Sequence, residues 1–259
     1  MKTLQGIITL FVTCLSILTL PCAATSYMDQ YAVNLNKDGI PTEYRIVLDP
    51  RQRTTLSAEV NSKIKEISRE MGDAFNSGDI LVRLEDKIFR AIHKKTKFLL
   101  QRAQEQLTAK RELFDDNVAS LFELKNAQAE LAVAEADLET AMKELESCTI
   151  TAPYSGHIDN ILINQHETIQ VGQPIVKIVN DKTLLGKLLV PSYFFDKVKL
   201  GQALTIRLKE NDQDISAVIT HIGAVIDPSS SMFKIFAEID NRDGNLRAGM
   251  TGTTSLKDF

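Results

Sequence analysis

Residues 86–147 read DKIFRAIHKKTKFLLQRAQEQLTAKRELFDDNVASLFELKNAQAELAVAEADLETAMKELES and contain neither glycine nor proline. The stretch is rich in Ala, Leu, Glu, Lys and Gln, which are strong helix formers. Asp115-Asp116-Asn117 interrupts it near the middle as an expected turn and N-cap cluster. The stretch therefore predicts helices at residues 87–113 and 118–146 that fold back on each other as an antiparallel hairpin. Each helix would be about 40 Å long.

Apolar residues in the second predicted helix follow a heptad. One position of every heptad is leucine, at Leu124, Leu131, Leu138 and Leu145. Leu121 and Met142 occupy the alternate position, which Gln128 and Glu135 interrupt, so the predicted seam is imperfect. A weaker register in the first helix joins Ile92, Leu99 and Leu113. A sustained repeat of 3.5 residues is typical of a coiled-coil face. A pair of ordinary bundle helices is the alternative, although the chain offers few other helices to complete a bundle.

Two β-type segments that resemble each other flank the predicted hairpin. The first runs from Val60 to Leu84 and the second from Ser155 to Ile178. Each consists of a strand, a polar turn, a short apolar piece, a glycine-containing turn and a second strand. The sequence therefore contains an internal repeat that is interrupted in its middle. Further β-type runs separated by turn residues continue to the end of the chain, which indicates an α+β fold.

Two half-motifs of this kind form the lipoyl or biotinyl-carrier sandwich. A sandwich split by an α-hairpin resembles the HlyD-type membrane fusion proteins, the periplasmic adaptor subunits of tripartite efflux and secretion pumps. Residues 149–158, TITAPYSGHI, are similar to the strand that follows the hairpin in this family, and residues 246–250, LRAGM, to the end of its β-barrel domain. The resemblance implies a lipoyl-like β-sandwich split by an inserted antiparallel coiled-coil α-hairpin and followed by a small β-barrel domain. It is closest to RND-type adaptors, in a short form that lacks their membrane-proximal domain.

The chain opens with Met1-Lys2 and an apolar run from Leu4 to Leu20, which predict a signal peptide cleaved after Ala24. An uncleaved anchor is the alternative. The expected organisation is a signal peptide at 1–24, an N-terminal strand region that contributes to the β-barrel at 25–55, a first lipoyl-like half-motif at 56–85, the coiled-coil hairpin at 86–147, a second half-motif at 148–180 and the β-barrel domain at 181–259.

Composition excludes several classes of function. After cleavage the chain keeps one cysteine, Cys148, so no intramolecular disulfide is expected. The net charge of −4 comes without a basic patch, which argues against a nucleic-acid partner. The four histidines show no metal-ligand spacing, and no phosphate-binding loop, nucleophile elbow or paired-carboxylate pattern occurs. We therefore expect no enzymatic activity, no metal and no cofactor.

Lys87 is the residue that favours a different interpretation. Glu85-Asp86-Lys87 resembles the Asp-Lys turn that carries lipoate in true carrier domains. A carrier lysine needs an exposed tight turn, whereas Lys87 falls in the first turn of a predicted helix. A lipoyl or biotinyl carrier is therefore an alternative function, and a free-standing periplasmic structural or binding protein is another.

The family resemblance implies a protein of the periplasm that associates with the inner-membrane complex. Such an adaptor bridges an inner-membrane transporter and an outer-membrane channel, and it forms a homo-oligomeric ring. In the efflux branch the hairpin tip contacts the channel through an Arg, a Leu and a Ser. Here Leu113 and Ser120 keep the Leu-to-Ser spacing, while Ala109 occupies the Arg position with Lys110 beside it. Lys110, Leu113 and Ser120 are thus the expected partner-contact residues.

Overall fold

The computed structural model describes residues 32–35 and 41–256, so the predicted signal peptide lies outside the described residues. These residues form two compact units, which are described separately. The strand unit holds the described residues up to Asp49, Leu185–Ile239, and those from Gly249 onward. The hairpin unit holds Pro50–Leu184 and Asp240–Ala248. No helix among the described residues is long and apolar enough to cross a membrane.

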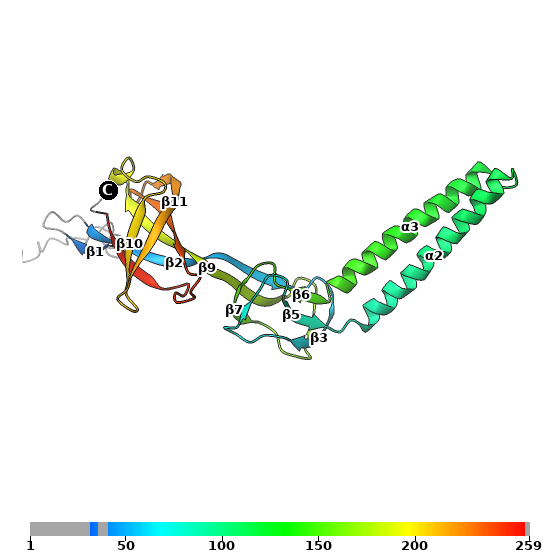
Figure 1. The fold of residues 1–259 in the computed structure, drawn as a ribbon, viewed down its shortest axis with the longest axis horizontal. Helices are drawn as coiled ribbons and strands as arrows, with labels where there is room; N and C mark the ends of the chain where they lie inside the picture. The colour runs from blue at the N-terminus through cyan, green and yellow to red at the C-terminus, as the bar shows by residue number, and fades with distance from the viewer. Residues whose placement is uncertain (1–31, 36–40, 257–259) are drawn as a thin grey trace, which may run out of the picture. The chain divides into compact units, whose positions relative to one another are not determined.

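The hairpin unit contains the two long helices and the strands on either side of them (Figure 1). Its elements are β3 (Ser62–Ile67), β4 (Ala74–Phe75), β5 (Ile80–Leu84), α2 (Lys87–Asp115), α3 (Leu121–Glu146), β6 (Thr149–Thr151), β7 (Gly156–Ile161) and β8 (Thr168–Ile169). One sheet has the order β6-β5-β3-β8, and β7 pairs with β4 and with the first part of β9 (Pro174–Pro191). The predicted α-hairpin is confirmed, and the class is α+β.

The internal repeat is present as two interlocked halves. The amides of Ile64 and Gly78 donate to the carbonyls of Glu167 and Ala152. At the equivalent positions of the other half, the amides of Ile158 and Gly172 donate to the carbonyls of Asp73 and Ala58. Each half therefore completes the turns of the other. The shared core contains matching apolar positions from both halves: Ile64 and Ile158, Phe75 and Ile169, Leu81 and Ile175, Val82 and Val176, and Leu84 and Ile178.

The strand unit is formed by parts of two long strands and by four strands of its own. The long strands are β2 (Pro41–Ser57) and β9, and the others are β10 (Ala203–Leu208), β11 (Asp214–Asp227), β12 (Met232–Asp240) and β13 (Thr251–Ser255). A short strand, β1 (Ala32–Leu35), pairs with the start of β2. The order β2-β13-β10-β11-β12-β9 is closed into a ring by a pairing of β2 with β9. Alternate residues of β10 are buried and exposed, as expected where one face of a strand covers an apolar interior.

Candidate functional site

The seam between α2 and α3 is a regular coiled-coil interface with spacings that alternate between three and four residues. On α2 its buried or half-buried residues are Phe89, His93, Thr96, Leu100, Ala103, Leu107, Lys110 and Phe114. On α3 they are Leu124, Ala127, Leu131, Ala134, Leu138, Ala141 and Leu145. The predicted leucine position of the heptad is confirmed.

The predicted alternate position of the seam is wrong. Leu121 and Met142 are exposed, and so are Gln128 and Glu135, the two residues expected to interrupt the seam. The buried residues are instead Ala127, Ala134 and Ala141. In the first helix the predicted register through Ile92, Leu99 and Leu113 fails at both ends, because Ile92 and Leu113 are exposed, whereas Leu99 is half-buried. A small side chain at every second seam position lets two helices approach closely, which explains why alanine replaces the larger residues there.

The turn at the tip begins at Asp116-Asn117, which confirms part of the predicted turn cluster, but the N-cap of α3 lies farther along the chain, at Ser120. Asp115 is still helical, and Asp116 is the C-cap of α2. Asn117 has a φ of 61°, a left-handed conformation that asparagine tolerates better than most residues. The amides of Val118 and Ala119 then donate to the carbonyl of Leu113 at 2.8 and 2.9 Å, which satisfies the end of α2.

Ser120 is the N-cap of α3 and forms a capping box with Glu123. The Glu123 amide donates to the Ser120 hydroxyl at 3.2 Å, and the Ser120 amide donates to the Glu123 carboxylate at 2.9 Å. Lys110 Nζ donates to the other oxygen of that carboxylate at 2.7 Å. The bond from Lys110, followed by those from Ser120, lowers the pKa of Glu123 to about 2. The two helices are thereby joined by charge at their tip.

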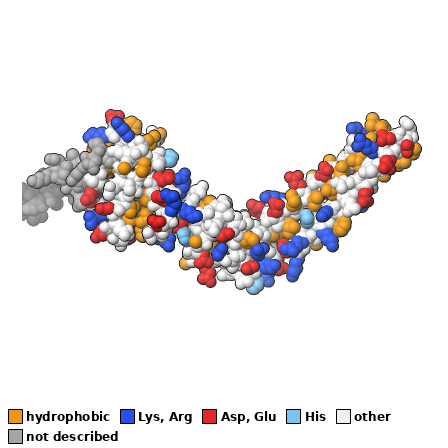
Figure 2. Space-filling model, in the orientation of Figure 1, with side chains coloured by type: hydrophobic (Ala, Val, Ile, Leu, Met, Phe, Trp, Pro, Cys, Tyr) orange, Lys and Arg blue, Asp and Glu red, His pale blue; other side chains and the backbone are white. Residues whose placement is uncertain are grey.

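Four apolar side chains close to this polar network in the sequence are exposed. The exposed fractions are 40% for Leu113, 72% for Val118, 57% for Leu121 and 72% for Phe122. Figure 2 shows hydrophobic side chains gathered at this end of the hairpin. Single exposed apolar residues are common on proteins, whereas large exposed apolar patches often belong to interaction sites. We call Leu113, Val118, Leu121 and Phe122 the tip patch.

The three residues expected at the tip lie close to the turn but differ in environment. Lys110 and Ser120 both contact the carboxylate of Glu123, so their polar groups are already engaged inside the hairpin. Leu113 belongs to the tip patch. Val118 and Phe122 were not predicted from the sequence, although a signal existed: both are apolar, flank the turn and fit no seam position.

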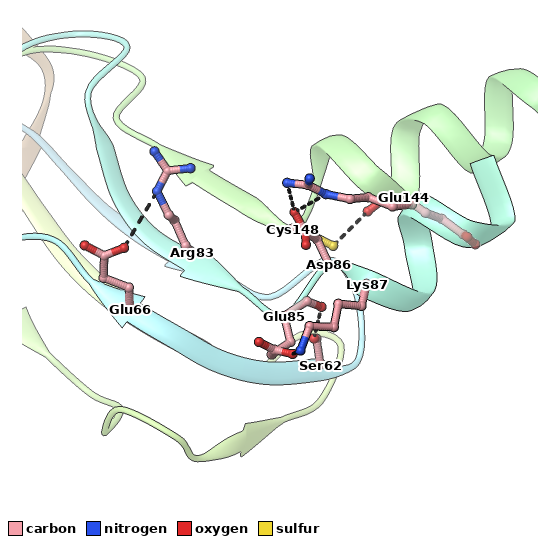
Figure 3. Close-up of polar contacts among 9 residues, drawn as sticks. Ser62, Glu66, Arg83, Glu85, Asp86, Lys87, Glu144 and Cys148 are labelled. Atoms are coloured by element: carbon pink, nitrogen blue, oxygen red, sulfur yellow. Dashed lines mark hydrogen bonds and ion pairs between the residues drawn. The ribbon is translucent and has the colours of Figure 1, made fainter. Parts of the chain in front are cut away.

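The root of the hairpin contains Lys87 and Cys148 (Figure 3). Lys87 is the first residue of α2, and its ammonium lies 3.7 Å from the carboxylate of Glu85. Burial, followed by the charges of Asp86 and Glu144, raises the pKa of the Cys148 thiol to about 11, so the thiol is protonated and a poor nucleophile at neutral pH. Within residues 32–35 and 41–256, no three His, Cys, Asp or Glu side chains are grouped so that they could hold a metal ion.

No protein-family model matches the chain. Among curated proteins, the chain is 28% identical over 210 residues to an uncharacterized protein of Haemophilus influenzae, an alignment that covers 78% of this chain and 53% of that protein. It is 24% identical over 231 residues to the nodulation protein NolF of Rhizobium meliloti, covering 83% of this chain and 63% of NolF. The chain thus spans between about half and two thirds of the length of these relatives.

Solved structures share the fold over most of the chain. A MacA–MexA chimeric protein containing the α-hairpin domain of Pseudomonas aeruginosa MexA matches 83% of this chain and 78% of its own length, with a TM-score of 0.71 and 21% identity. The membrane fusion protein Spr0693 from Streptococcus pneumoniae matches 83% of this chain and 98% of its own length, with a TM-score of 0.66 and 19% identity. A putative efflux transporter from Bacteroides eggerthii has a TM-score of 0.70 at 17% identity, covering 82% of this chain and 67% of its own length. The expected resemblance to membrane fusion proteins is confirmed at the level of the fold.

Proposed function

We propose that this chain, which has the fold of membrane fusion proteins, is a periplasmic adaptor that bridges an inner-membrane transporter and an outer-membrane channel in efflux or secretion. The observation that carries the proposal is the tip patch at the end of a hairpin whose own seam is already filled. Because the helices satisfy each other along their length, the tip patch is left available for another protein. Helix tips of this kind bind by packing a few apolar side chains into a groove between partner helices.

The architecture in this proposal is the one that the sequence predicts. The interlocked halves in the hairpin unit correspond to a lipoyl-like sandwich, with half-motifs at 56–85 and 148–180 separated by the hairpin. The closed strand order of the strand unit supports a small β-barrel domain at 181–259, to which residues 25–55 contribute a strand. Lys87 lies in a helix and pairs with Glu85, which disfavours the carrier alternative.

The proposed protein works by binding and not by catalysis, and it assembles as a homo-oligomeric ring in the periplasm beside the inner membrane. Large apolar side chains on the shaft of the hairpin support assembly, since Phe98 and Val133 are exposed away from the seam. Side-by-side packing of hairpins from neighbouring copies would cover such residues. Transporter contact would then involve the strand unit.

The tip patch can be tested with matched charge insertions in cells. Leu113→Asp and Phe122→Asp would each place a carboxylate in the proposed apolar contact, where burying an unpaired charge costs several kcal/mol. Ala132→Asp adds the same charge at an exposed position of α3, away from the tip. Each variant would complement a strain that lacks the gene, and growth would be measured against a panel of antibiotics, dyes and detergents.

We expect the two tip variants to lose complementation while keeping the helical circular dichroism and melting temperature of the unmodified protein. Ala132→Asp reports the effect of added charge alone, and we expect a smaller loss of complementation from it. If both tip variants fold and complement fully, the tip patch is not the joint with a channel.

A further inference from the structure

A groove of about 990 Å³ lies on the strand unit, over the outer faces of β2, β9 and β12. These three strands are neighbours in the closed ring. Tyr44, Ile46 and Leu48 of β2 are buried in its interior, so the alternating residues Arg45 and Val47 face outward. The groove is therefore separate from the apolar core of the ring.

A bulge in β11 forms one wall of the groove. Ile222 pairs with Ile235 and Ile226 pairs with Phe233, so Gly223–Val225 on β11 face the single residue Lys234 on β12. The chain passes close to β12 here, because a Cβ added to Gly223 would lie 2.9 Å from the carbonyl oxygen of Lys234. Beyond Gly223, Val225 is exposed and lines the groove. Bulges of this kind shape binding edges on many sheets.

Three cations from three adjacent strands line the groove: Arg45 on β2, Lys187 on β9 and Lys234 on β12. Neighbouring strands are about 4.8 Å apart, so strand spacing alone places the three within roughly 10 Å across the sheet. Nε of Arg45 is buried and has no hydrogen-bond partner among the described residues. Within that part of the chain, none of the three cations forms an ion pair with a carboxylate.

Two carboxylates also line the groove and balance this row only in part. Asp227 accepts hydrogen bonds from the amides of Ser229 and Ser230 at 2.8 and 3.3 Å, and these bonds, with a smaller contribution from the charge of Lys234, hold its pKa below the ordinary value. Asp49 is exposed to solvent on β2. Three positive charges against two negative charges leave a net positive charge on the lining of the groove.

The remaining lining is apolar and includes Val47, Leu189, Met232 and Val225. Such a combination suits a ligand with an anionic head and an apolar body, because the cations fix the head and the apolar walls bury the rest. We propose that this groove binds an amphiphilic organic anion, with the head at Arg45, Lys187 and Lys234. The inference goes beyond the adaptor role, since such binding needs neither transporter nor channel.

The test measures decanoate binding to the purified protein by isothermal titration calorimetry, below the concentration at which decanoate forms micelles. Decanol and decyltrimethylammonium are the neutral and cationic comparisons. Lys187→Gln and Arg45→Gln each remove one cation, and we expect each to weaken decanoate binding about tenfold. Lys199→Gln removes an exposed lysine of the same unit outside the groove and should leave binding unchanged. Val225→Glu, at an exposed site, keeps all three cations but adds a repelling charge, and it should weaken decanoate more than decanol.

The same protein is then floated with phosphatidylglycerol vesicles to separate two sources of the ligand. Co-flotation that Lys187→Gln abolishes identifies a membrane lipid, whereas decanoate binding without co-flotation identifies a free amphiphile. The proposal is overturned if decanoate does not bind, if decanol and decanoate bind equally, or if Lys187→Gln and Lys199→Gln behave alike.

Discussion

The ammonium group of Lys110 and the carboxylate of Glu123 lie 2.7 Å apart and join α2 to α3 beside the turn. Glu123 also completes the capping box with Ser120, so one carboxylate both caps the start of α3 and links α3 to α2. Lys110 and Ser120, two of the three residues expected to bind a channel, thus stabilise the turn beside the tip patch.

Acid should loosen this tip only at low pH. Because the bond from Lys110 and those from Ser120 lower the folded-state pKa of Glu123 from the ordinary 4.5 to about 2, the stabilisation is fully present above about pH 4.5. It is lost as the pH falls through about 2. The measurement is an NMR titration of the Glu123 carboxyl carbon, and we expect its midpoint near pH 2. In Lys110→Met the midpoint should rise toward 4.5; an unchanged midpoint would show that the ion pair does not form in solution.

The alanine line of the seam should resist enlargement. Ala134 is buried between the helices, so Ala134→Leu adds three carbons where no space exists, at a cost of about 1–3 kcal/mol. Ala132→Leu makes the same chemical change at an exposed position of the same helix and should be nearly neutral. Thermal unfolding followed by circular dichroism at 222 nm measures the stability of the hairpin, because α2 and α3 supply the α-helix among the described residues. Equal melting temperatures for the two variants would contradict the packing of Ala134 between the two helices.

The leucine position of the seam could be predicted because leucine at every seventh residue of a helix is typical of a coiled-coil face. The alanine position could not be recognised by size: Ala127, Ala134 and Ala141 are as typical of any helix as of a seam, and Met142 was a larger apolar neighbour. Burial distinguishes them, and burial depends on which face of α3 meets α2. The register of the hairpin is therefore fixed by packing between the two helices, which the heptad of one helix does not display.

The sequence contains a signal for the start of α3 that the predicted helix bounds do not include. Ser120 and Glu123 match the capping-box pattern of Ser or Thr followed three residues later by Glu. The predicted cluster at Asp115-Asp116-Asn117 places the N-cap of α3 too early, because Asp115 and Asp116 end α2. The repeat around the hairpin was visible in sequence because turn glycines and buried aliphatic residues recur together in both halves. His166, with a φ of 69°, occupies the turn position of Gly72, which no glycine pattern could reveal.

Asn241 should be a strong determinant of local stability in the hairpin unit. Its buried amide donates to the carbonyls of Asp181 at 2.7 Å and Leu246 at 2.9 Å, and its oxygen accepts from the Leu246 amide at 2.8 Å. Asn241→Ala removes three buried hydrogen bonds, a loss of about 2–4 kcal/mol. Asn211→Ala, in an exposed turn, is the matched control. Hydrogen exchange of peptides covering residues 240–248 should accelerate in the first variant alone; equal exchange in both would count against this role.

Gly156 should tolerate no side chain, and the reason differs from that for the turn glycines. A Cβ at Gly156 would lie 1.9 Å from the carbonyl oxygen of Val179 on the paired strand, so Gly156→Ala must push β7 away from β9. Main-chain atoms cannot rotate aside as a side chain can, and we expect a cost on the order of 3 kcal/mol or more. Gly172 has open space around it but a φ of 83°, so Gly172→Ala should cost only about 1–2 kcal/mol of backbone strain.

Hydrogen exchange can separate these two effects. Gly156→Ala should expose amides along β7 and the adjoining part of β9, because their pairing is lost. Gly172→Ala should affect only the turn that precedes β9. If the β7 amides of the Gly156→Ala variant exchange as slowly as those of the unmodified protein, the two strands do not approach so closely at this position. This conclusion does not depend on the melting temperature of the variant.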